Sequence, residues 1–118
     1  MSKRRENVDG FEMTMGVNHL GHFYLTHLLW KLLKAADRPR IINVSSEGHR
    51  GNKNVGAIDF DDMNLNHNFE GSTAYMRSKM ANVLFAKELQ AKMREAGLQG
   101  SAFSLHPGVI ASDIGRDL

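Results

Sequence analysis

Cysteine is absent from this chain of 118 residues, and proline and tryptophan occur only twice and once. Without cysteine the protein forms no disulfide bridge and no metal site built on thiolate ligands. Its most apolar stretch, HFYLTHLLWKLLKAA, is interrupted by His27 and Lys31, and it is too short and too polar to predict a transmembrane segment. The N-terminal sequence MSKRRENVDG has no apolar segment, so we expect no secretory signal there.

A large charge of one sign is also missing. The formal net charge is +2, and the basic residues are dispersed apart from Lys3, Arg4 and Arg5, so the composition predicts no nucleic-acid partner. Of the six histidines, His19, His22 and His27 share the first helical pattern, but their spacing does not put three on one face with a carboxylate. We therefore predict no metal site. We expect an intracellular, cytoplasmic location, and membrane association stays open.

The first of two helical patterns covers residues 11–36. A capping box formed by Asp9 and Glu12 is expected at its start. Gly16 and Gly21 lower the helix propensity and permit close packing or a local irregularity. The second half is apolar over so much of its circumference that we expect burial on more than one side.

The second helical pattern covers residues 73–96, and Gly97 provides its C-terminal stop. Its expected apolar stripe consists of Met76, Met80, Val83, Leu84, Ala86, Leu89 and Met93. Two short apolar runs are typical of strands: RIINVS at 40–45, expected to be buried, and GSAFSLHPG, which ends at Pro107. The polar, aperiodic segment 46–72 is typical of a functional or mobile loop.

The order helix, strand, loop, helix, strand indicates an α/β protein in which a crossover helix joins parallel strands. Ser46 follows the first strand, and Tyr75 opens the second helix, with Lys79 four residues later on the same face. An ammonium group near a phenol favours the phenolate, which suits a general acid or base, and a serine hydroxyl can bind the reacting oxygen. By itself this spacing is also compatible with an exposed tyrosine and a solvated lysine.

Four blocks of the chain, in order, resemble the short-chain dehydrogenase/reductase family: VNHLGHFYLTHLL, RIINVSSEGHR, AYMRSKMANVLFAKEL and LHPGV. Within that family they are most similar to the retinol dehydrogenase and WW-domain oxidoreductase branch. The resemblance covers nearly the whole chain after Asp9. It implies a partial Rossmann-like, doubly wound parallel sheet and reversible hydride transfer between NAD or NADP and an alcohol/carbonyl pair.

The resemblance also implies a role for each catalytic residue. Tyr75 corresponds to the acid/base of the family, and Lys79 to the lysine that favours its phenolate and binds the nicotinamide ribose. Ser46 corresponds to the serine that orients and polarises the substrate oxygen. Asn18 corresponds to the asparagine that holds a water in the proton relay to Lys79.

The resemblance implies that Tyr75, Lys79, Pro107, Gly108 and Ser112 lie near the nicotinamide. The chain contains no G-x-G, so the Gly-rich turn that holds the dinucleotide phosphates in this family is not encoded, and the resemblance implies NAD or NADP as the cofactor.

The chain therefore resembles the central catalytic portion of such an enzyme. We expect a single truncated domain over residues 1–118, in which residues 1–8 are disordered and residues 9–118 form the catalytic segment.

Two functions follow from these observations. The chain is either the catalytic segment of an oxidoreductase for a small hydrophobic alcohol or aldehyde, inactive as the isolated 118 residues, or a non-catalytic interaction module. The module would form a homo-oligomer or associate with a full-length relative, because the two long helices commonly form the subunit interface in this family. An incomplete gene model is a third interpretation.

Overall fold

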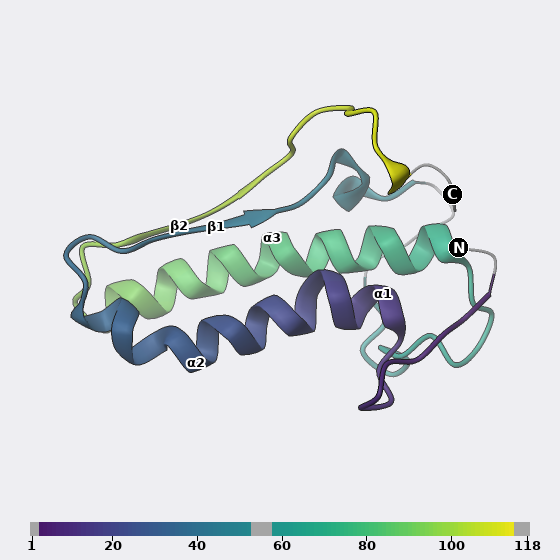
Figure 1. Ribbon diagram of the computed structural model, residues 1–118, viewed down its shortest axis with the longest axis horizontal. Coiled ribbons are helices and arrows are strands. Elements are labelled where there is room, and N and C mark those ends of the chain that lie inside the picture. Colours follow the sequence, from purple (N-terminus) through teal and green to yellow (C-terminus); the bar gives the residue numbers. More distant parts are fainter. Residues whose placement is uncertain (1–2, 53–57, 115–118) are drawn as a thin grey trace.

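The computed structural model describes residues 3–52 and 58–114 (Figure 1). The predicted alternation of helices and strands is confirmed. The elements in chain order are α1 (Met13–Met15), a π-helical turn (Gly16–Leu20), α2 (Gly21–Ala35), β1 (Arg40–Val44), a 3-10 turn (Glu47–Arg50), α3 (Gly71–Glu95) and β2 (Ser101–Leu105). The first predicted helix is thus continuous from 13 to 35, and its irregularity lies between the two glycines named above.

The strands β1 and β2 form a parallel pair in the described part of the chain, with Arg40 opposite Ser101 and Val44 opposite Leu105. The crossover helix α3 packs against this pair and lies between it and the first helix (Figure 1). The predicted α/β class and parallel pairing are therefore confirmed.

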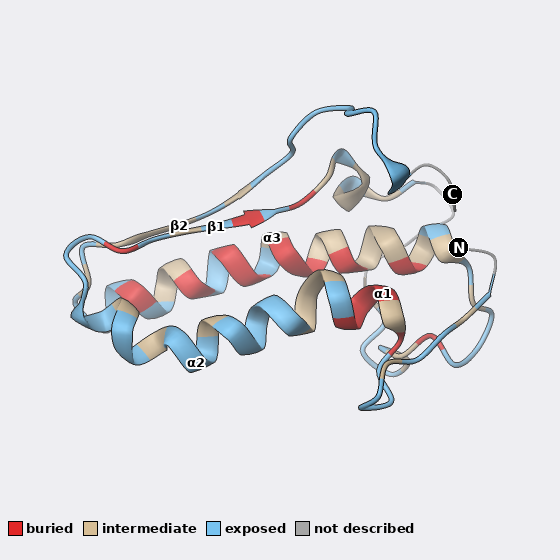
Figure 2. Ribbon diagram, viewed as in Figure 1, coloured by how far each residue is buried: buried red, intermediate tan, exposed pale blue. Residues whose placement is uncertain are grey.

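The core is small and lies mostly along α3 (Figure 2). Its buried apolar residues are Met15, Leu65, Ala74, Ala81, Phe85, Ala86, Leu89 and Met93. The predicted stripe of α3 is correct only for its last members, because Leu84 is 45% exposed and small residues occupy the inner face near the helix start. The predicted stop is confirmed: Gly97 has φ +71°, and the Leu98 N–H donates to the Met93 carbonyl at 2.9 Å.

The expectation that the first helix is buried on more than one side is wrong for the described residues. No residue of α2 is buried, and its apolar surface is largely open (Figure 2). Ile42 and Val44 of β1 are also half exposed, so the expectation of a buried strand is wrong as well. The physical reason is that the described residues place a helix on only one face of the strands. The second helical layer that normally covers the other face of a parallel sheet is not among them.

The N-terminal cap differs from the predicted capping box. The carboxylate of Glu12, which is 1% exposed, accepts hydrogen bonds from the Thr14 and Met15 N–H groups at 2.9 Å each. Asp9 is exposed and takes no part in the cap. The Glu12 N–H in turn donates to Oδ1 of Asn64 at 2.6 Å, so the segment before α3 completes the helix start.

The polar segment before α3 has no regular structure over residues 58–70, and residues 53–57 of the predicted loop lie outside the described residues. Leu65 of this segment is buried, and Arg77 of α3 donates to the Asp62 carbonyl. Residues 6 and 12 form an isolated antiparallel bridge. The expected disorder of residues 1–8 stays a prediction.

We predict that Glu12→Gln lowers the free energy of unfolding by about 1–3 kcal/mol, because it points an amide NH₂ at a buried N–H that needs an acceptor. The matched change Asp9→Asn should alter this free energy by less than about 0.5 kcal/mol. Urea denaturation of both variants measures the difference. Equal losses would show that Glu12 is not the cap.

Candidate functional site

The carboxyl ends of the two strands meet at one edge of the sheet, next to the predicted site residue Ser46. The Ser45 N–H donates to the Leu105 carbonyl at 2.7 Å, which continues the pairing by one residue. The Glu47 N–H donates to Nδ1 of His106 at 3.2 Å and ties the 3-10 turn to the residue after β2. Side chains that follow either strand therefore share one edge of the sheet.

Ser46 and Tyr75 border the same small space. The Oγ of Ser46 accepts a hydrogen bond from the Gly48 N–H at 3.1 Å. A Cβ atom placed on Gly48 would lie 3.5 Å from this oxygen and 3.5 Å from Cε1 of the Tyr75 ring. Glycine thus leaves room between the serine hydroxyl and the tyrosine ring. Within residues 3–52 and 58–114 no hydrogen bond joins the Tyr75 hydroxyl to another residue.

Lys79 lies between Tyr75 and the end of β1. Its Nζ is 5.7 Å from the centroid of the Tyr75 ring and donates to the Val44 carbonyl at 3.2 Å. The Ser45 hydroxyl donates to the backbone carbonyl of Lys79 at 2.8 Å. The strand end therefore holds both the backbone and the side chain of this lysine.

Asn18 lies in the π-helical turn and faces α3. Its Nδ2 donates to Oγ of Ser78 at 3.0 Å, and this hydroxyl donates to the Tyr75 carbonyl at 2.7 Å. Asn18 and Lys79 also line a common cavity of about 160 Å³, together with His22, Ile42, Asn43, Val44 and Asn82. The cavity is large and polar enough to hold water, and π turns are frequent at functional sites.

The structure brings the four candidate catalytic residues to one region but leaves the C-terminal candidates apart. Pro107, Gly108 and Ser112 are exposed in the segment after β2, and Gly108 has φ +93°. Among the described residues, no hydrogen bond joins any of the three to Tyr75 or Lys79. Their position near a cofactor stays a prediction.

Three buried polar residues support this region, and two of them, Ser78 and Asn82, were not predicted from the sequence. Ser45, Ser78 and Asn82 are 4%, 0% and 4% exposed, and each binds a neighbouring element. A usable signal existed, because Ala74, Ser78 and Asn82 recur at intervals of four residues and form a small, polar line along α3.

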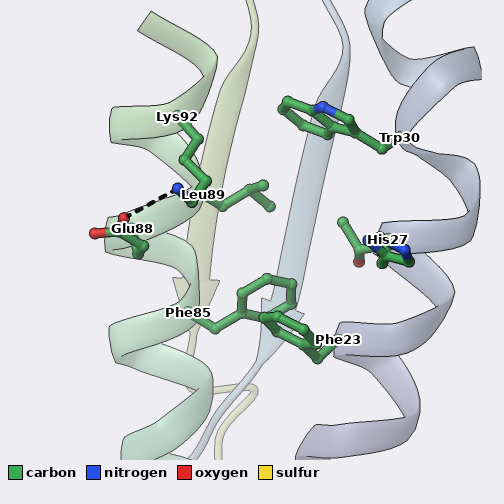
Figure 3. A pocket seen from close by; sticks show the side chains of 8 residues that line it. Phe23, His27, Trp30, Phe85, Glu88, Leu89 and Lys92 are labelled. Carbon is green, nitrogen blue, oxygen red and sulfur yellow. Dashed lines mark ion pairs between the residues drawn. The ribbon is translucent and has the colours of Figure 1, made fainter. Parts of the chain in front are cut away.

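A separate groove of about 200 Å³ lies between α2 and α3 (Figure 3). Phe23 and Trp30 point into it from α2, and Phe85 and Leu89 from α3. The ring centroids of Phe23 and Phe85 are 5.2 Å apart. The groove is apolar and contains none of the candidate catalytic residues.

Over the described ranges, no three His, Asp or Glu side chains are grouped so that they could hold a metal ion. None of the helices in the same ranges combines the length and the hydrophobicity needed to cross a membrane.

The chain is similar in sequence and structure to known proteins. No family model matches the chain. It is 43% identical over 111 residues to retinol dehydrogenase 11 of Mus musculus, covering 94% of this chain and 33% of that protein. It is 50% identical over 109 residues to retinol dehydrogenase 13 of Homo sapiens, covering 92% and 31%. It also matches a crystal structure of an uncharacterized protein from Mycobacterium paratuberculosis with a TM-score of 0.79 and 38% identity, covering 98% of this chain and 40% of that one.

The parallel pair with its crossover helix and these similarities together show that the chain belongs to the short-chain dehydrogenase/reductase family, whose members typically use NAD or NADP. Within the family it falls in the retinol dehydrogenase branch. The chain spans about a third of the length of the curated relatives that it matches.

The half-buried position of His19 makes the stability of the protein depend on pH. Burial lowers the pKa of His19 below its usual value of 6.5, the hydrogen bond with Asn82 opposes this shift, and the charge of His22 adds to it. The folded protein therefore binds a proton on His19 less readily than the unfolded chain does. The stability that His19 contributes is present above pH 6.5 and is lost as the pH falls towards the lower folded pKa.

We expect the free energy of unfolding to decrease between about pH 7.5 and pH 5.5, and His19→Gln to reduce this decrease. Urea denaturation across that range measures the slope, and His22→Gln is the control that should retain most of it. Identical slopes for the wild type and His19→Gln would contradict the prediction.

Proposed function

We propose that this chain, from residue 9 onwards, is the catalytic segment of an NAD(P)-dependent oxidoreductase that interconverts an alcohol and a carbonyl compound. The supporting observation is the arrangement around Tyr75. The Ser46 hydroxyl borders its ring through the space above Gly48, and the Lys79 ammonium approaches the ring near the end of β1. The retinol dehydrogenase relatives support a hydrophobic, retinoid-like alcohol or aldehyde as substrate.

In the proposed reaction, the bound nicotinamide supplies or accepts the hydride. Tyr75 donates a proton to the carbonyl oxygen during reduction and removes it during oxidation. Ser46 donates a hydrogen bond to the same oxygen, since its Oγ accepts from Gly48 and keeps its own proton free. The positive charge of Lys79 stabilises the negative charge left on Tyr75 after proton donation.

The cavity that Asn18 shares with Lys79 provides a route for the proton that Tyr75 loses. Water in this cavity would connect the lysine ammonium to the π turn without crossing the apolar core. With a cofactor bound, Pro107, Gly108 and Ser112 would contact its nicotinamide end. This assignment rests on family resemblance.

The test is a graft, in which residues 11–112 replace the matching third of human retinol dehydrogenase 13, followed by assay of alcohol oxidation through nicotinamide absorbance. We expect Tyr75→Phe to reduce turnover at least about 10²-fold, since general acid–base catalysis contributes about 10²–10⁴-fold. The chain offers a matched control in its other tyrosine, the exposed Tyr24, and Tyr24→Phe should leave turnover within about twofold. Retention of more than about a tenth of the activity by Tyr75→Phe would remove Tyr75 from the catalytic role.

A second candidate function is association with another copy of the chain through the two long helices. The open apolar face of α2 favours it, because Leu28 and Leu32 are 60% and 67% exposed and the groove against α3 is lined by aromatic rings. Exposed apolar surface of this kind marks interaction sites. A second copy that packs α2 and α3 against their counterparts would cover both the face and the groove.

We predict that the chain self-associates in sedimentation velocity experiments, and that Leu28→Gln with Leu32→Gln raises the dissociation constant at least about tenfold, since burying each leucine contributes about 1.5–3 kcal/mol. Phe60→Gln is the control, because Phe60 is 77% exposed but lies in the segment before α3. A monomer at all concentrations, or an equal effect of Phe60→Gln, would refute association through α2.

A further inference from the structure

The side chain of Asn82 joins three elements near the candidate site. It is buried on α3, and its Nδ2 donates to the Asn18 carbonyl in the π turn at 2.9 Å and to the Val44 carbonyl at the end of β1 at 3.2 Å. Its backbone carbonyl accepts from Nδ2 of Asn43 at 3.4 Å. One residue therefore bridges the turn, the strand end and the helix that carries Tyr75.

These contacts determine the orientation of the Asn82 amide and the protonation of His19. Only the NH₂ group of Asn82 can donate to two carbonyls, so its Oδ1 faces Nδ1 of His19, 3.1 Å away. That nitrogen must then carry the imidazole proton. The His19 ring is held edge-on to Phe85 at 5.7 Å and lies 6.0 Å from Phe23, so packing restricts its rotation.

Asn82 is also linked to the candidate catalytic lysine, because both side chains donate to the same backbone carbonyl. The Val44 carbonyl that accepts from Asn82 accepts from Nζ of Lys79 as well, at 3.2 Å. A displacement of Asn82 therefore moves or frees the carbonyl to which Lys79 is bound. An apolar side chain at position 82 would leave the Asn18 and Val44 carbonyls without this donor.

We propose that His19 and Asn82 act as a positioning pair that sets the location of the Lys79 ammonium and of the Asn18 turn. His19 orients the Asn82 amide, and Asn82 holds the two carbonyls. Neither residue touches the substrate. The proposal rests on the proposed function in so far as Lys79 takes part in catalysis, but the geometry of the pair can be measured without turnover.

The first experiment is nitrogen-15 NMR of the wild-type 118-residue chain at a pH where His19 is neutral. We expect the proton of His19 on Nδ1. A neutral ring protonated on Nε2 would overturn the proposal, whatever the behaviour of any variant, because Asn82 could not then be oriented as described.

The second experiment compares Asn82→Asp with Gln90→Glu, which makes the same amide-to-acid change on α3. Gln90 binds only the β2 side, accepting from the Ala102 N–H at 2.9 Å and donating to the Gly100 carbonyl. We expect Asn82→Asp to shift the Lys79 ammonium resonance and, in the graft, to lower kcat about 10- to 100-fold, as expected when a reacting group is displaced, with KM for the alcohol within about twofold. Gln90→Glu should do neither. Equal effects of the two variants, or an unmoved Lys79 signal, would overturn the proposal.

If Asn82→Asp does not fold, the pair His19→Gln and His19→Phe decides the question. Glutamine retains an N–H donor for Asn82, whereas phenylalanine removes it. We expect the Lys79 ammonium resonance to be retained in His19→Gln and shifted in His19→Phe, and the same shift in both would overturn the proposal. A graft that shows no turnover would refute the proposed function alone, since both NMR readouts remain.

Discussion

The close approach of α3 to its neighbours on both sides is the constraint on which the rest of the structure depends. Ala74 and Ala81 present only methyl groups there, so the backbone of α3 comes near the strands and the first helix. Ser78 and Asn82 use their short polar side chains to bind the π turn, and Asn82 binds the strand end as well. The helix that carries Tyr75 is thereby held from both sides.

The surfaces left open follow from the same arrangement. Parallel sheets of α/β proteins normally carry helices on both faces, but the described residues supply a helix to one face only. Ile42 and Phe103 are each 51% exposed on the other face, and the apolar side of α2 is open as well. Both surfaces have the apolar composition of an interior, and the core of the described residues lies mostly along α3.

The helices and strands could be predicted from the sequence because their periodicity is a local property. The wrong predictions concern caps and burial, which depend on residues far away in the sequence. The Glu12 cap depends on Asn64, 52 residues further along, and the burial of α2 depends on a layer absent from the described residues. Residue spacing and family resemblance predicted Tyr75, Lys79 and Ser46 as candidate catalytic residues. They missed Asn82, because an amide in a helical pattern is usually solvated, and only the fold shows the carbonyls that it meets.

The π turn affects the directions in which the side chains of the first helix point. Each residue of an α-helix advances by about 100° around the axis, and a π turn inserts one additional residue. The angle between the Asn18 carbonyl and the open face of α2 is therefore set within Gly16–Leu20. The wider turn absorbs the additional residue, so the aromatic rings of α2 still face the groove while the Asn18 carbonyl points towards α3. The same helix thus contacts the candidate site near one end and lines the apolar groove further along.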